Sequence, residues 1–405
     1  MSDHDSANNL RSDDEFSDFD LHRKDIRVGA ERLWDRMRAQ PGLPHSKKLG
    51  GFRLVTKFAD LKKALLNAPI FSSGAGITIP EAHVRTRHIP SEIDPPLHGE
   101  YRGLMSRFMT SDKVKKMEPA TRALTIRLLD AIKDRTHVDF VEVFARPLPV
   151  FVSLELLSLP AEDGLLLDNL VVELHEEVAS GIKTGASDKL RNYVERSLLN
   201  RKASVTSADE DMMSGILLGS VSGRALTLEE QVSMVRQILI GGFDSTAIAL
   251  ATAIWWLAEH PQDAQRLRED PSLIDTASEE VVRFASPASY LRRTVTQDTE
   301  LGGTQLHEGD WIVLAFAAAN RDPTVFESPE TLRLDRTPNN HAGFGFGVHR
   351  CIGSFVAKLE LRVALTEFLN RYSEFRVDPS KPIRFSSGLN QGIIALPLIL
   401  GAPRQ

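Results

Sequence analysis

The 405-residue sequence predicts a mainly helical protein with small β-sheets, folded as a single domain. Apolar residues recur at spacings of three and four along most of the chain, which is typical of helices with one buried face. Short β-like runs bounded by glycine or polar turns stand out at residues 51–56 and 310–314. The sequence contains neither an internal repeat nor a low-complexity linker after its opening, so several domains are not indicated.

Composition excludes several classes of protein. Apolar residues make up 42% of the chain and charged residues 26%, as in an ordinary globular protein. The net charge is −6 and no basic stripe stands out, which argues against nucleic-acid binding. No run approaches the roughly 20 apolar residues of a membrane helix, and no signal peptide precedes the domain. The single cysteine excludes an intrachain disulfide and a multi-cysteine zinc site, so we expect a cytoplasmic protein without a membrane partner.

The opening of the chain differs from the rest. Residues 1–20 hold seven Asp and Glu against one Arg and show no helical periodicity. Such a segment cannot bury enough apolar surface to offset the entropy lost on ordering. We therefore expect residues 1–24 to form a flexible acidic tail and residues 25–405 to form the folded, catalytic domain.

Helical periodicity is clear in seven segments. Five are of ordinary length: 26–39, 98–110, 117–134, 163–180 and 187–203. The longest runs from about Leu226 to His260, with Thr227 and Glu230 resembling a capping box and Pro261 following its end. At ~1.5 Å per residue this helix spans roughly 50 Å, enough to cross a whole domain. A further helix is expected just after Cys351.

The only cysteine lies in a glycine-rich segment, FGFGVHRCIG at residues 344–353. Glycine permits positive φ and lets the backbone approach a flat ligand closely. The start of a helix and the positive charge of His349 and Arg350 both favour thiolate over thiol. A lone cysteine is usually a small buried hydrophobe, but these neighbours favour a metal ligand.

This segment resembles the haem-binding loop of the cytochrome P450 family, F-x-x-G-x-[HR]-x-C-x-G, at every defined position. The resemblance implies the P450 fold, a helix-rich triangular prism around a buried haem b. It makes the Cys351 thiolate the axial iron ligand, which favours O–O cleavage. It also puts Phe344 beside the sulfur and His349 near a haem propionate, with Gly345 and Gly353 in the same loop.

Other motifs occur in the order that the family shows. His98 and Arg102 have H-x-x-x-R spacing, and together with Arg293 the resemblance makes them propionate ligands, because two carboxylates need cationic donors. Three further residues are assigned to stability rather than chemistry: Glu280 and Arg283 resemble the family's E-x-x-R pair, and Arg336 its third partner.

Two adjacent glycines, Gly241 and Gly242, lie inside the longest helix, where each costs about 1 kcal/mol relative to alanine. They indicate either a kink or tight helix crossing, or a helix that widens over a bound ligand. The segment resembles the P450 acid–alcohol motif, [AG]-G-x-[DE]-T. On that basis Asp244 relays protons from solvent and Ser245 hydrogen-bonds dioxygen or its water network. Thr246, one position later, substitutes for Ser245 only if the helix shifts.

The substrate contacts are predicted from position. Residues 71–102 resemble the camphor-hydroxylating bacterial group, but Thr86 replaces a substrate-binding tyrosine there, which argues against camphor itself. A buried Gln237 needs a partner, either a substrate oxygen or a neighbouring loop. Arg85, Arg87 and His88 indicate either carboxylate binding or a solvated loop. The predicted contact residues are Ile77, Thr86, His88, Ser91, Gln237, Ile240, Gly241 and Ser289.

The expected activity is a monooxygenase that inserts one oxygen atom of O2 into a C–H bond of a small, largely apolar terpenoid or aromatic molecule. Only 405 − 351 = 54 residues follow Cys351, so we expect a separate ferredoxin and its NAD(P)H-dependent reductase to supply electrons. Either a basic docking face or scattered surface charge accounts for Arg102, Lys113, Lys115, Lys116, Arg350, Lys358 and Arg362. A peroxide-driven P450 and a non-catalytic haem sensor are the alternatives. A zinc-binding helix is not indicated, because the pair His175 and Glu176 is not followed by the second histidine that such a helix needs.

Overall fold

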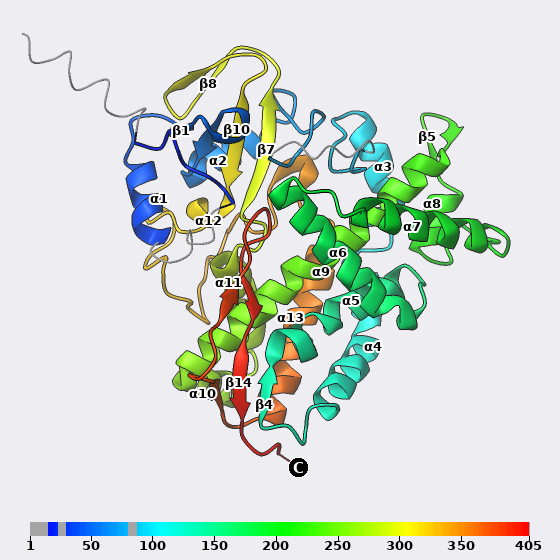
Figure 1. Cartoon of the computed structure of the whole chain (residues 1–405), viewed down its shortest axis with the longest axis vertical. Coiled ribbons are helices and arrows are strands. Elements are labelled where there is room, and N and C mark those ends of the chain that lie inside the picture. Colours follow the sequence, from blue (N-terminus) through cyan, green and yellow to red (C-terminus); the bar gives the residue numbers. More distant parts are fainter. Residues whose placement is uncertain (1–14, 23–29, 80–86, 405) are drawn as a thin grey trace, which may run out of the picture.

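The computed structural model describes residues 15–22, 30–79 and 87–404, and helices build most of it (Figure 1). The helices are α1 (Ala30–Arg38), α2 (Phe58–Leu66), α3 (Leu97–Ser106), α4 (Ser111–Asp130), α5 (Pro147–Leu156), α6 (Gly164–Ser180), α7 (Ala186–Lys202), α8 (Met212–Leu217), α9 (Leu228–Glu259), α10 (Pro261–Glu269), α11 (Leu273–Ala285), α12 (Phe316–Ala319) and α13 (Ser354–Arg371). The prediction of a mainly α, single-domain fold with small sheets is confirmed.

The sheets are short and lie at the edges of the helical body. Their strands are β1 (His45–Ser46), β2 (Phe52–Val55), β3 (Phe71–Ser72), β4 (His137–Asp139), β5 (Ser220–Val221), β6 (Arg224–Ala225), β7 (Tyr290–Val295), β8 (Thr299–Leu301), β9 (Thr304–Leu306), β10 (Trp311–Ala315), β11 (Phe375–Val377), β12 (Arg384–Phe385), β13 (Ile393–Ala395) and β14 (Pro397–Leu400). The largest has the order β1-β2-β10-β7-β3, with β2 and β10 parallel. Both strands predicted from the sequence, β2 and β10, are therefore neighbours in one sheet.

Helix α9 runs through the middle of the molecule, and α5, α6, α7, α11 and α13 all pack against it (Figure 1). Thr227 and Glu230 form the capping box expected at its start, and Pro261 begins α10 directly after its end. By length and composition α9 is apolar enough to cross a membrane. However, 67% of its most apolar window is buried inside this protein, which identifies it as a core helix.

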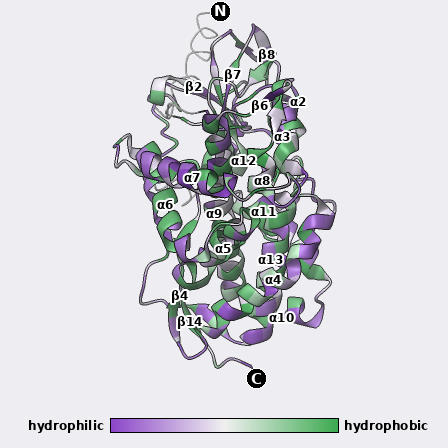
Figure 2. Ribbon diagram, turned by 90° about the vertical axis from the view of Figure 1, so that its right-hand side faces the viewer, coloured by the Kyte–Doolittle hydropathy of each residue, from purple (hydrophilic) through white to green (hydrophobic). Residues whose placement is uncertain are grey.

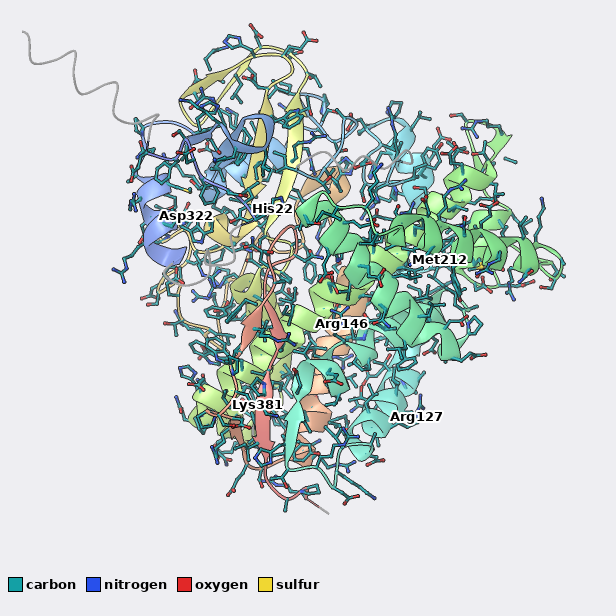
Figure 3. The ribbon with its side chains drawn as sticks, in the orientation of Figure 1. His22, Arg127, Arg146, Met212, Asp322 and Lys381 are labelled. Carbon is teal, nitrogen blue, oxygen red and sulfur yellow. The ribbon has the colours of Figure 1, made fainter. Side chains whose placement is uncertain are left out.

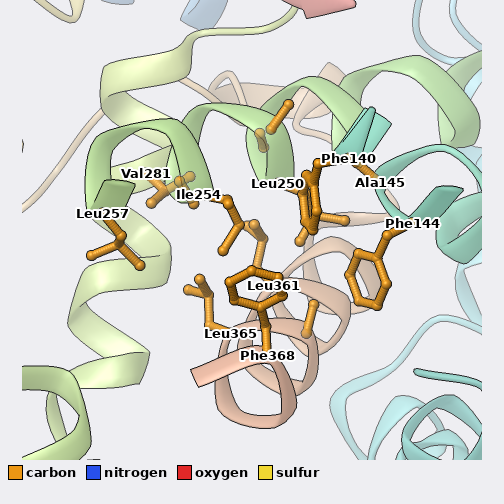
Figure 4. Packing of buried hydrophobic residues seen from close by; sticks show 14 of the residues in the cluster. Phe140, Phe144, Ala145, Leu250, Ile254, Leu257, Val281, Leu361, Leu365 and Phe368 are labelled. Carbon is orange, nitrogen blue, oxygen red and sulfur yellow. The ribbon is translucent and has the colours of Figure 1, made fainter. Parts of the chain in front are cut away.

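The main core lies where α4, α9, α11 and α13 meet. Figure 4 shows Phe368 of α13 in one cluster with Leu250 and Ile254 of α9 and with Phe140. The rings of Phe140 and Phe368 meet edge to face, with centroids 5.4 Å apart. Peripheral helices such as α7 and α10 are largely hydrophilic (Figure 2). This packing fixes α9 against α13, the two helices that carry the candidate site.

The expected N-terminal tail is partly wrong. Residues 15–22 pack against the protein, with Phe16, Phe19 and Leu21 no more than 5% exposed. Phe19 meets Trp34 of α1 edge to face, and its carbonyl accepts a hydrogen bond from the Ser46 hydroxyl. The three apolar residues, spaced among acidic ones, supply enough burial to order this part. The remainder of residues 1–24 lies outside the described residues.

The predicted helices agree with the structure within about four residues, except that α4 begins at Ser111 rather than at 117 and that the expected start at residue 26 lies outside the described residues. Helices α2, α8, α10 and α12 were not among the predicted segments. Helix α5 was missed, because nearly all of its residues are apolar and no polar face marks a helical period. It packs against α9, so it has little solvent-facing surface to reveal its period.

Glu280, Arg283 and Arg336 form the buried network that the motifs predicted. Arg283 donates two hydrogen bonds to Glu280, of 2.7 and 2.8 Å, and Arg336 donates to the same carboxylate at 2.9 Å. Glu280 and Arg283 are wholly buried, and Arg336 is 5% exposed. Arg283 also donates to the carbonyls of Asn320 and Pro329. The network therefore ties α11 to the segment that leads into the cysteine loop.

Replacing Glu280 with glutamine should lower the free energy of unfolding by about 3–5 kcal/mol, because two buried guanidinium groups lose their carboxylate. The midpoint of urea unfolding measures this loss. The matched control is Glu327→Gln, since Glu327 is 84% exposed and pairs with Arg333 at the surface. That variant should lose about 0–1 kcal/mol. Equal losses in the two variants would contradict the assigned role of the buried network.

Candidate active site

One large cavity of about 1480 Å³ opens between α6, α9, α13 and the cysteine loop. It exceeds the roughly 300–1,000 Å³ of an ordinary small-molecule pocket. Its walls include Asp244, Ser245 and Thr246 from α9 and Cys351 from the loop before α13. The cavity can therefore hold a flat macrocyclic cofactor together with an organic substrate.

The cysteine loop is held in place by its backbone. The Cys351 amide donates a 2.7 Å hydrogen bond to the Phe344 carbonyl, which closes the loop. Gly345 and Gly347 have φ values of 67° and 69°, in the left-handed region that favours glycine. A Cβ on Gly347 would lie 2.6 Å from the carbonyl oxygen of Leu65. Glycine is thus required at residue 347 both by conformation and by space.

The environment of Cys351 pulls its pKa in two directions. Burial raises the pKa of the thiol, while the Gly353 amide, Arg102 and Arg350 oppose that rise. The net effect is a raised pKa, so the protein alone does not stabilise the thiolate as the sequence had suggested. A coordinated metal ion deprotonates a thiol outright, which far exceeds these effects. A free, cavity-facing thiol therefore fits a metal ligand.

Cationic and imidazole side chains gather beside the cysteine loop. The rings of His98 and His349 lie against each other with centroids 4.3 Å apart. His98 Nε2 is buried and has no hydrogen-bond partner among the described residues. Arg293 is 4% exposed, and Arg102 donates to the Arg350 carbonyl at 2.5 Å. All four groups line the cavity, and their role as propionate ligands stays a prediction.

This cluster has too little negative charge of its own. Burial lowers the pKa of His349 to about 3, with help from the positive charges of Arg293 and His98. Burial likewise lowers the pKa of Arg293 to about 10, with only partial compensation from Asp94. A ligand bearing two carboxylates would relieve both effects. The residues present therefore fit a haem with its propionates.

The two adjacent glycines of α9 have separate purposes. A Cβ on Gly242 would lie 2.7 Å from the Ser153 hydroxyl of α5, so this glycine permits a tight helix crossing. A Cβ on Gly241 would meet nothing closer than the Gln237 amide nitrogen at 3.7 Å. The Ser245 hydroxyl donates to the Gly241 carbonyl at 3.1 Å. Gly241 and Ser245 thus expose polar backbone and hydroxyl atoms on one stretch of cavity wall.

Asp244 is held by two partners from other elements. His175 Nδ1 of α6 lies 2.5 Å from Asp244 Oδ2, and Arg146 lies 3.1 Å from Oδ1 (Arg146 is labelled in Figure 3). Burial raises the pKa of Asp244, but His175 and Arg146 outweigh burial and hold it below its usual value. Asp244 is therefore a carboxylate at neutral pH. Neither partner was assigned to the site from the sequence.

Thr246 has a different partner from Ser245. It is 6% exposed and interacts with Glu360 of α13, which is itself 2% exposed. Burial raises the pKa of Glu360 to about 8, against a smaller opposing effect of Thr246. A glutamate in an amphipathic helix is normally a surface charge, so nothing in the sequence marked Glu360. The structure adds it to the cavity wall.

Most of the predicted substrate contacts do line the cavity, namely Ile77, His88, Ser91, Gln237, Ile240 and Gly241. Thr86 lies outside the described residues. The prediction for Ser289 is wrong: it is wholly buried, and its hydroxyl donates to the Ser286 carbonyl at 3.0 Å. The neighbouring Ala288 and Leu291 face the cavity instead. Gln237 Oε1 has no hydrogen-bond partner among the described residues, so it is free to accept a hydrogen bond from a donor such as a substrate hydroxyl.

Several cavity residues carried no signal in the sequence. They come from the outer face of α6, with Leu165 and Val172, and from the β12–β13 hairpin, with Phe385 and Ile394. Leu165 is 74% exposed, and the β12–β13 hairpin comes from a distant part of the chain. Single exposed apolar residues are common on protein surfaces, which is why sequence alone could not select them.

Comparison with known proteins agrees with this geometry. A family model described as Cytochrome P450 matches residues 180–397. "Cytochrome P450 109" of Bacillus spizizenii is 30% identical over 366 residues, which cover 87% of this chain and 86% of that protein. "Steroid C26-monooxygenase" of Mycolicibacterium smegmatis is 33% identical over 372 residues, covering 89% and 91% respectively.

Solved structures show the same architecture. CYP109E1 from Bacillus megaterium, in complex with testosterone, superposes with a TM-score of 0.83 at 28% sequence identity. The match covers 93% of this chain and 99% of that one. The fold expected from the cysteine-loop resemblance is therefore confirmed.

The raised pKa of Glu360 predicts a pH-dependent stability. With a pKa of about 8 folded and 4.5 as the ordinary value, the folded state binds more protons between these limits. Stability should therefore fall as pH rises through this window, because ionising Glu360 favours unfolding. Glutamine stays neutral, so the melting temperature of Glu360→Gln should exceed that of the unmodified protein by an amount that grows as pH rises through this window. Thermal denaturation at a series of pH values measures this, with the exposed Glu374→Gln as control. A constant difference in melting temperature would contradict the prediction.

Proposed function

Because the chain belongs to the cytochrome P450 family and is a monooxygenase of the bacterial type, we propose that Cys351 holds haem b through its thiolate and that the enzyme hydroxylates a largely apolar organic molecule. The observation that carries this proposal is the shared cavity. It brings the free thiol, the under-compensated cations and the acid–alcohol segment of α9 to one place. Bound haem supplies the activation of O2 and the oxidation of the C–H bond.

The protein's own side chains have separate tasks in this proposal. His98, Arg102, Arg293 and His349 bind the propionates, since they converge on one side of the cavity without enough anionic partners. Phe344, Gly345 and Gly353 shape the loop around the sulfur.

In this proposal a second group of residues, Asp244, Ser245 and Thr246 of α9, delivers protons. The Ser245 hydroxyl donates a hydrogen bond to the Gly241 carbonyl, which leaves its oxygen able to accept a hydrogen bond from water in the cavity. Asp244 is ionised and can take up a proton and pass it on. Thr246 is engaged with Glu360 and thus has a supporting role. An intact acid–alcohol segment favours O2-dependent turnover over the peroxide-driven and sensor alternatives.

Electrons in this proposal come from a ferredoxin and its NAD(P)H-dependent reductase in the cytoplasm. The predicted docking face needs revision, because Lys358 pairs with Glu279 at 2.8 Å and Arg362 with Glu118 at 2.7 Å. Paired cations contribute little long-range attraction. Arg102 is only partly exposed and lines the cavity. The exposed cations that remain are Lys113, Lys115, Lys116 and Arg350. We propose that these four steer an acidic partner toward the cysteine side.

The substrate proposal rests on apolar walls and size. The cavity is large enough for a polycyclic molecule beside the haem, beyond the small terpenoid or aromatic expected from the sequence. The similar proteins named for a steroid C26 position and solved with testosterone support this size class. We propose an apolar, polycyclic substrate with few polar groups.

The thiolate proposal predicts a specific spectrum. After haem reconstitution, the reduced protein with CO should absorb at the red-shifted Soret position that marks thiolate ligation. Cys351→Ala should lose this band, since no other cysteine exists in the sequence. The matched control is Val348→Ala, an exposed residue of the same loop, which should retain the band. A Cys351→Ala protein with an unchanged spectrum would refute the proposal.

Substrate size is tested by ligand-induced spin change in the ferric protein. Across a library of apolar compounds graded from one to four rings, polycyclic members such as testosterone should shift the iron toward high spin most strongly. The reason is that a larger apolar ligand removes more surface from water on entering the cavity. Spectral titration gives each dissociation constant. A response confined to single-ring compounds would overturn the size class but leave haem ligation untouched.

A further inference from the structure

The carboxylate of Asp244 is held by groups from three parts of the fold. Asp244 is on α9, His175 is on α6, and Arg146 directly precedes α5. His175 Nδ1 lies 2.5 Å from one carboxylate oxygen, and Arg146 lies 3.1 Å from the other. The two contacts differ in what they can do chemically.

Arg146 is a fixed partner. Its Nε and NH2 groups donate to Asp168 at 3.1 and 2.5 Å, while NH1 faces Asp244. A guanidinium is not deprotonated in proteins, so Arg146 can hold Asp244 but cannot supply a proton. Asp168 offsets much of its positive charge.

His175 is the partner that can exchange protons. An imidazole has two nitrogens, so it can take a proton at one and release another from the second. Its Nδ1 contacts Asp244, while Nε2 is buried without a hydrogen-bond partner among the described residues. His175 lines the cavity. A buried polar atom without a protein partner is normally satisfied by water or ligand, so Nε2 is the expected contact for a cavity water.

Several charged and titratable groups face His175. The charged and titratable groups that face it are Arg146 and Asp168, Asp244, and His88 from the loop before α3, whose charge interacts with His175. Arg146 is shared between Asp168 and Asp244, and it keeps its proton in both contacts. The pair formed by Asp244 and His175 is thus left as the place where a proton can be shared.

We infer that His175 is both a positioning residue for Asp244 and the group that hands it protons. Nε2 accepts a proton that arrives from solvent through water, and Nδ1 releases its proton to Asp244 Oδ2. The net change is one proton moved from solvent to the carboxylate, with no electrons transferred. The ring then regains its first tautomer by proton exchange with water. This inference rests on the proposed function, because it requires Asp244 to serve oxygen activation.

The test separates holding from proton transfer. His175→Asn places an amide N–H near the position of Nδ1 and keeps the hydrogen bond to Asp244, but it has no second ring nitrogen. His175→Phe removes both. In substrate-free holoenzyme with a plant-type ferredoxin and its reductase, oxygen consumption driven by NADPH should fall about tenfold in both variants. The solvent deuterium isotope effect on that rate should rise in both.

The control is a variant of another α6 residue, and the second measurement is nitrogen NMR. Glu173→Gln, also on α6 but paired at the surface with Lys189, should leave the rate unchanged. Nitrogen NMR of labelled histidines, which needs no turnover, should show His175 Nδ1 protonated and shifted by Asp244→Asn.

The outcomes are distinguishable. A His175→Asn rate equal to that of the unmodified enzyme, with only His175→Phe impaired, would reduce His175 to a positioning residue and overturn the proton transfer. Full rates in both variants would overturn the inference altogether. Should the unmodified protein lack the thiolate CO band, the proposed function fails instead, whatever the histidine variants do.

Discussion

Helix α9 has to fill the core along most of its length and yet leave a short stretch around Gly241, Asp244 and Ser245 open to the cavity, and this constraint shapes the rest of the structure. Residues 246–254 are buried without a break, whereas Gly241, Asp244 and Ser245 keep exposed surface in the cavity. A helix can change its environment so abruptly only if its neighbours diverge. Helix α5 crosses tightly at Gly242, and α6 stays farther out, joined to α9 through Asp244. The cavity is thus a consequence of how three helices cross.

The cysteine loop depends on a second, more local constraint. Gly347 is pressed against the Leu65 carbonyl in a left-handed conformation, and the Cys351 amide closes the loop on Phe344. The buried Glu280–Arg283 pair anchors the chain leading into this loop. Buried charges are an expensive way to stabilise a fold, but they specify one geometry. Here that geometry presents a thiol to the cavity, so rigidity far from the sulfur determines where a metal ion can be held.

How far the sequence could predict this protein depended on whether a signal was local. Cys351, the glycines around it and the Glu280 motif are encoded in short segments, and the capped helix α9 has strong periodicity; all were identified. Helix α5 was missed because a nearly all-apolar run shows no helical period. Ser289 was wrongly assigned to the cavity because packing determines the direction of a side chain outside a helix. Glu360 and His175 looked like ordinary helix residues. Glu360 interacts with Thr246, and His175 contacts Asp244. Each partner lies about 70 residues or more away in the chain, so no local pattern reveals the contact.

The two polar groups in this largely apolar cavity are balanced in opposite ways. Beside His98 and His349 the positive charge of Arg293 is buried without sufficient counter-charge, and burial lowers the pKa of Arg293 and of both imidazoles. Such an arrangement is unfavourable unless an anionic ligand completes it. Around Asp244 the opposite holds, since Arg146 and His175 already compensate the carboxylate. One group therefore has the character of a binding site, whereas the charge of the other is already compensated by the protein's own side chains.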